Sequence, residues 1–69
     1  MLKTPEDVFL DWCSDVLWRA TTDLGNNTAP LWHSIEGRAV ITEALSHLGS
    51  MPEVIRMSRE VIRGYLLAN

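Results

Sequence analysis

The chain has 69 residues and a mass of 7.8 kDa, with 46% hydrophobic residues, 22% charged residues and a net charge of -3. This length allows one domain, residues 1–69, and excludes the longer dinucleotide-binding, TIM-barrel and two-domain enzyme folds. The apolar fraction is too high for a disordered tail. No apolar run reaches the roughly 18 residues of a membrane span, and the N-terminus lacks the pattern of a secretory signal.

A chain this short usually needs an extra stabilising device. Its single cysteine, Cys13, excludes an intrachain disulfide and favours a reducing, cytoplasmic setting. One Cys and two His do not supply the ligands of a structural zinc, so we expect no metal and no cofactor. Oligomerisation is the remaining stabilising device, and we therefore predict self-association, with a homodimer favoured.

The first predicted helix spans about residues 5–24. Thr4 can cap it, Pro5 suits its first position, and the two acidic residues that follow are favoured by the helix dipole. Gly25 predicts its end. Apolar residues recur at helical spacing and predict one buried face. That face comprises Leu10, Cys13, Leu17, Ala20 and Leu24, widened by Phe9, Trp12 and Val16.

The second predicted helix spans about residues 29–48 and ends before Gly49. Apolar residues cover most of its circumference, which predicts a central helix and a self-association surface. Gly37 lies inside it, so we expect a kink or a close helix crossing there. His33 and His47 share its polar side but lie roughly 21 Å apart. They are interpreted as solvated side chains rather than as ligands of one metal.

The third predicted helix spans about residues 51–67. Ser50 and Glu53 have the spacing of a capping box. The turn before this helix is so short that the second and third helices must be adjacent. No segment alternates like a strand, so the predicted fold is all-α, a compact three-helix unit. The predicted central stripe of the third helix comprises Val54, Ser58, Val61 and Tyr65, flanked by Met51, Ile55, Ile62 and Leu66.

The sequence offers no catalytic constellation. Cys13 sits in the apolar stripe of the first helix and is interpreted as a small buried hydrophobe. Nucleophilic catalysis needs a base and an orienting group beside the nucleophile, and no such set is apparent. No glycine-rich phosphate-binding pattern is present. We therefore predict that the protein is not an enzyme.

Trp18 is the most informative single residue. On a helical projection it shares a polar stripe with Asp11, Asp15 and Thr22, away from the apolar face. A large aromatic side chain on an acidic surface is typical of an interface anchor for a basic partner surface. The alternative is that Trp18 packs under the following loop or against another helix. Trp32 is interpreted either as part of the same patch or as a core-edge or dimer residue.

Arginines form a basic stripe on the third predicted helix, at Arg56, Arg59 and Arg63. The simplest interpretation is a solvated face paired with neighbouring glutamates. The alternative is DNA binding, because residues 41–63 loosely resemble a helix-turn-helix with these arginines facing the groove. The sequence pI of about 5.1 argues against a DNA-binding domain.

Together these patterns favour a small non-catalytic regulator or inhibitor that docks a helix face on another protein. The predicted partner site comprises Asp11, Asp15, Trp18, Thr22 and Trp32. Because the chain starts at Met and shows no linker, we interpret it as a complete gene product, of a kind common in phages and mobile elements. The alternative function is that of a helix-turn-helix DNA-binding transcriptional regulator.

Overall fold

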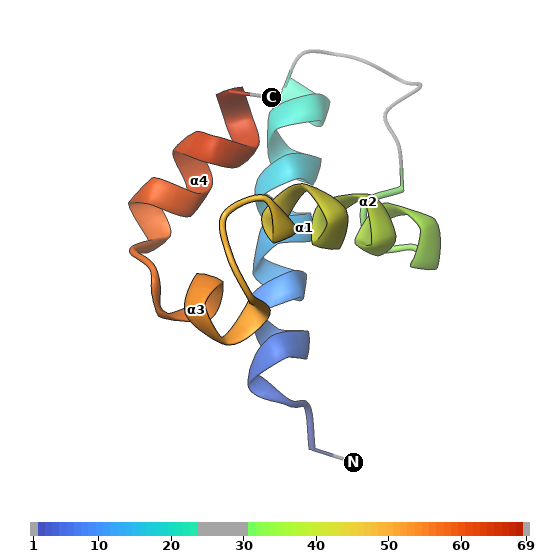
Figure 1. Ribbon diagram of the computed structural model, residues 1–69. Helices are drawn as coiled ribbons and strands as arrows, with labels where there is room; N and C mark the ends of the chain where they lie inside the picture. Colours follow the sequence, from blue (N-terminus) through green and yellow to red (C-terminus); the bar gives the residue numbers. More distant parts are fainter. Residues whose placement is uncertain (1, 24–30, 69) are drawn as a thin grey trace.

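The computed structural model of the protein describes residues 2–23 and 31–68. Over these ranges the chain is helical and contains no strand, which confirms the all-α prediction. It has four helices rather than three within the described residues (Figure 1). They are α1 (Pro5–Asp23), α2 (Ile35–Ser46), α3 (Met51–Arg56) and α4 (Arg59–Ala68).

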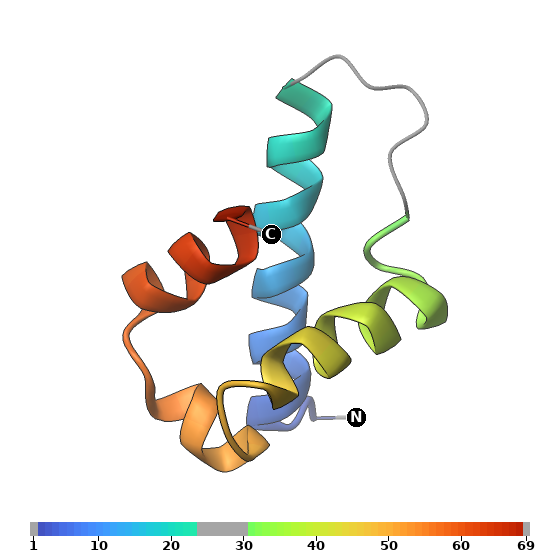
Figure 2. The ribbon, with the colours of Figure 1, turned by 45° about the horizontal axis from the view of Figure 1, so that its top comes forward.

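The central helix is α1. It packs against α2, α3 and α4, and α2 also packs against α3, as the short turn between them required. Figure 2 shows α2 crossing α1 and the end of α4 reaching α1. The prediction that the second helix is central is therefore wrong. Part of the apolar surface of α2 faces outward instead, and Ile35 and Val40 are 86% and 56% exposed.

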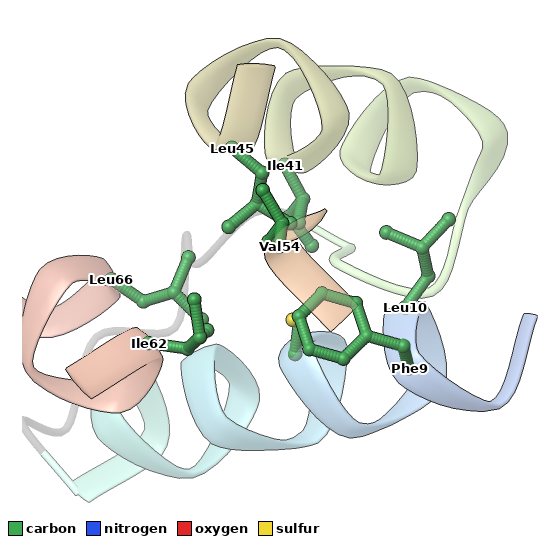
Figure 3. Close-up of a cluster of buried hydrophobic side chains, with 8 residues drawn as sticks. Phe9, Leu10, Ile41, Leu45, Val54, Ile62 and Leu66 are labelled. Atoms are coloured by element: carbon green, nitrogen blue, oxygen red, sulfur yellow. The ribbon is translucent and has the colours of Figure 1, made fainter. Parts of the chain in front are cut away.

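The core joins all four helices. Its buried hydrophobic side chains point from α2, α3 and α4 toward α1 (Figure 3). Burial of these side chains is the main favourable term in the folding of so small a domain. The buried hydrophobic residues are Phe9, Leu10, Cys13, Ile41, Leu45, Val54, Ile62 and Leu66.

The start of α1 is confirmed. The backbone N–H of Asp7 donates to Thr4 Oγ1 at 3.1 Å, and the Thr4 N–H donates to Asp7 Oδ2 at 3.4 Å. These reciprocal bonds satisfy donors that the first turn leaves free. The predicted end at Gly25 lies outside the described residues.

The second helix begins at Ile35, later than predicted. Residues 31–34 form a turn, and Ser34 is the N-cap, with the Gly37 N–H donating to Ser34 Oγ at 3.1 Å. A Cβ added to Gly37 would lie 2.4 Å from the carbonyl oxygen of Leu31. Gly37 therefore permits close approach of the preceding turn, and does not mark a kink. The predicted stop before Gly49 is close to the observed end of α2 at Ser46, and Gly49, in the turn that follows, has a φ of 145° that is accessible mainly to glycine.

The third predicted helix is broken, so the single helix over 51–67 is wrong. Met57 has extended backbone angles, and Ser58 restarts the helix by accepting the N–H of Glu60 at 3.2 Å. The break turns Ile62 and Leu66 of α4 into the core. Of the predicted central stripe, only Val54 is fully buried, while Ser58 and Val61 are exposed.

The capping box before α3 is confirmed. The backbone N–H of Ser50 donates to Glu53 Oε1 at 3.2 Å, and the Ser50 hydroxyl donates to the same oxygen at 2.7 Å. These hydrogen bonds, the hydroxyl first, lower the pKa of Glu53. The box fixes the first turn of the six-residue α3.

Candidate functional site

The acidic stripe of α1 faces the turn that precedes α2. Asp11 forms ion pairs with Lys3 and with Arg38 of α2. Asp15 Oδ1 lies 2.8 Å from His33 Nε2. Both carboxylates therefore have a cationic or hydrogen-bonding partner within the chain, rather than standing free as the rim of a partner site.

Ser14 stabilises the same contact between α1 and the turn from its buried side. Its side chain is fully buried, and its hydroxyl lies 2.9 Å from the carbonyl oxygen of Leu10 and 3.0 Å from that of Trp32. Buried hydroxyls need such partners, because an unpaired one costs about 1–3 kcal/mol. Ser14 thus ties the turn that carries Trp32 to α1.

The two tryptophans of the predicted site lie in different environments. Trp18 is 42% exposed and Thr22 is exposed, so neither belongs to the core. Trp32 is partly buried and packs against the core. The indole Nε1 of Trp32 is buried and has no hydrogen-bond acceptor among residues 2–22 and 31–68. Trp32 is therefore placed at the core edge.

The first candidate surface is a groove between α1, α2 and α4, which we call the apolar groove. Its volume is about 370 Å³. The side chains at its rim include Val40 of α2 and Leu67 of α4, which are 56% and 48% exposed. The Tyr65 hydroxyl donates to the carbonyl oxygen of Ala44 at 2.7 Å and ties α4 to α2 beneath it. Other lining residues are Leu17, Ala20, Thr21, Trp32, Ile41 and Leu66.

The second candidate surface lies between α1 and α4, and we call it the basic groove. Its volume is about 670 Å³. Arg19 of α1 and Arg63 of α4 line it, and both are exposed. The sequence does not predict that the two arginines line one groove, because they are far apart in the chain. The remaining lining residues are Trp12, Asp15, Val16, Ala20 and Leu67.

The arginines of the DNA-binding alternative do not form one stripe. Arg56 ends α3, whereas Arg59 and Arg63 belong to α4. The Arg59 guanidinium carbon lies 4.6 Å from the ring centroid of Phe9 and 5.1 Å from that of Trp12. This cation–π stacking holds Arg59 against α1. The single recognition helix that the DNA-binding alternative assumed is therefore absent from residues 51–68.

The one thiol of the chain is an inert core group. Cys13 is fully buried, and this burial raises the pKa of its thiol to about 11, although Arg59 acts in the opposite direction. A neutral buried thiol is a poor nucleophile and a poor metal ligand. In the part of the chain that the structure describes, no three His, Cys, Asp or Glu side chains gather as a metal site.

No described helix combines the length and hydropathy needed to cross a membrane. No family model, curated protein or solved structure matches the chain. Function is therefore inferred from the two grooves and from the side chains around them.

Proposed function

We propose that the protein is a small, non-catalytic regulator or inhibitor that binds a partner protein through the apolar groove. The supporting observation is that Val40 and Leu67, on two different helices, expose aliphatic side chains at the rim of one apolar depression. Exposed apolar surface of this kind, bordered by polar residues, is typical of interaction sites. The buried thiol fits a reducing, cytoplasmic setting.

The partner is proposed to insert an apolar side chain between α2 and α4. Burying an aliphatic side chain that is half exposed contributes on the order of 1 kcal/mol. Affinity then comes from several such contacts in one central cluster. The action is steric, since the docked chain covers a surface on the partner. Trp18 and Thr22 would extend the contact along α1, while Asp15 holds the turn that carries Trp32 and Asp11 holds α2 through Arg38.

The test compares two substitutions on α4. Leu67→Gln changes a side chain that lines the apolar groove and also borders the basic groove, whereas Val61→Gln changes one of similar exposure that lines neither groove. The tagged chain is used to capture its partner from a lysate, and the partner is then identified and titrated against each variant. We expect Leu67→Gln to weaken binding roughly tenfold, and Val61→Gln to change it little.

Circular dichroism melts of both variants check that the helices remain intact. Equal affinity of the two variants for the partner would contradict the proposed use of the groove. Trp18→Ala serves as a further variant in the same titration, and its binding should weaken while its melting temperature stays nearly unchanged.

We also propose that the chain forms a homodimer through the outer side of α2. Ile35 at the start of α2 and Leu31 in the turn before it are 86% and 69% exposed, which leaves apolar surface unburied in the monomer. Light scattering at micromolar concentration should give twice the mass of 7.8 kDa, and Ile35→Ser should shift the chain to monomer. A monomer mass at every concentration would rule this out.

A further inference from the structure

The basic groove contains two arginines that take part in none of the ion pairs of the described residues. Within residues 2–22 and 31–68, the ion pairs use Lys3, His33 and Arg38, and none of them involves Arg19 or Arg63. These two arginines lie on facing helices and border the same depression. This stands out in a chain whose net charge is -3.

The side chains between the two arginines are mostly apolar. On α1 the groove is lined by Val16 and by the partly buried ring of Trp12, and on α4 it is lined by Leu67. Arg59 stacks on that same Trp12 ring and brings a further positive charge to this side of α1. The one carboxylate in the lining, on Asp15, is hydrogen-bonded to His33, and the two arginines outnumber it. The groove therefore suits an anionic group that is attached to an apolar body.

The basic groove is continuous with the apolar groove. Ala20 of α1 and Leu67 of α4 line both depressions. Figure 2 shows the end of α4 beside α1, and the hydrogen bond from Tyr65 to Ala44 ties α4 to α2 as well. A single extended or helical segment lying across Ala20 and Leu67 can therefore contact both grooves at once.

We infer that the partner segment carries acidic residues beside its apolar anchors, and that its carboxylates pair with Arg19 and Arg63. This inference rests on the proposed function, and it assigns the chemistry of the partner. Arginine favours carboxylates, because its planar guanidinium can donate two parallel hydrogen bonds. Ion pairs at an exposed rim contribute mainly to the selection of the partner and to the rate of association.

The test is a selection from a random twelve-residue peptide display library on the immobilised protein. We expect enriched peptides to combine aromatic or aliphatic residues with Asp or Glu at adjacent positions. The same selection on the Arg19→Gln/Arg63→Gln double variant should lose the acidic preference and keep the apolar one. Arg56→Gln is the matched control, because Arg56 is exposed but lines neither groove.

The strongest peptide is then synthesised and titrated against each protein. The double variant should bind it roughly five- to tenfold more weakly, as expected for two partly exposed ion pairs, and added salt should remove most of that difference. Apolar peptides without acidic enrichment would overturn the inference and leave the proposed function standing. A selection that enriches no peptide would overturn both.

Discussion

Gly37→Ala should lower the free energy of unfolding by roughly 2–3 kcal/mol, the upper end of the cost of overpacking. Ala is normally the better helix residue, by about 1 kcal/mol. Here an added Cβ would lie 2.4 Å from the carbonyl oxygen of Leu31 and 2.8 Å from the Cα of Trp32. Those are backbone atoms, and relieving the clash would move the turn that caps α2.

Gly64→Ala is the matched control for this substitution. Gly64 lies inside α4, is exposed, and would place its Cβ with no heavy atom within 4 Å. It should raise stability by about 0.5–1 kcal/mol. Urea unfolding followed by tryptophan fluorescence gives both values. Stabilisation of similar size by both substitutions would show that the turn does not lie against Gly37.

Ile41→Ala should be the most destabilising of the isoleucine substitutions on α2, at about 2–5 kcal/mol. Ile41 is 1% exposed and lies in the core between α2 and α1 (Figure 3). Ile35→Ala removes the same atoms from the same helix, but Ile35 is 86% exposed. Its unfolding free energy should change by less than about 0.5 kcal/mol.

Both isoleucine variants are compared by thermal and urea unfolding at a concentration where the chain is monomeric. This removes any contribution of the proposed dimer from the measured stability. Equal losses for the two variants would mean that α2 is buried on both sides. That result would remove the exposed apolar side from which self-association is inferred.

Local signals predicted where some helices begin. Thr4 with Asp7, and Ser50 with Glu53, are capping pairs whose hydrogen bonds form within one turn, so sequence spacing is enough to find them. The start of α2 was missed because Pro30 also suits a first helical position. Ser34 is the actual cap. Its side chain accepts the N–H of Gly37, the residue against which the preceding turn lies.

The break at Met57 was missed because helical periodicity continues across it. Ser58 falls in the predicted central stripe, although serine followed by Glu60 is also a helix-start pattern. The break is favoured by tertiary packing, since it lets Val54 and Leu66 reach one core from two helices of different direction. Packing of this kind overrides local propensity.

The candidate site was only partly visible in the sequence. The projection correctly separated Trp18 from the core, but it could not show that residues 31–38 supply partners for Asp11 and Asp15. Both grooves require facing helices, so their lining residues come from distant parts of the chain. The presence of Arg19 and Arg63 in one groove therefore cannot be predicted from their spacing in the sequence.

The most direct test of partner binding is site-specific photo-crosslinking in cells. A photoreactive benzophenone amino acid replaces Val40 at the rim of the apolar groove or, as the control, Val61, which lines neither groove. The account predicts one dominant crosslinked partner protein from position 40 and none from position 61. Crosslinks from position 61 alone, or the same product from both positions, would contradict the proposal that the partner binds in the apolar groove.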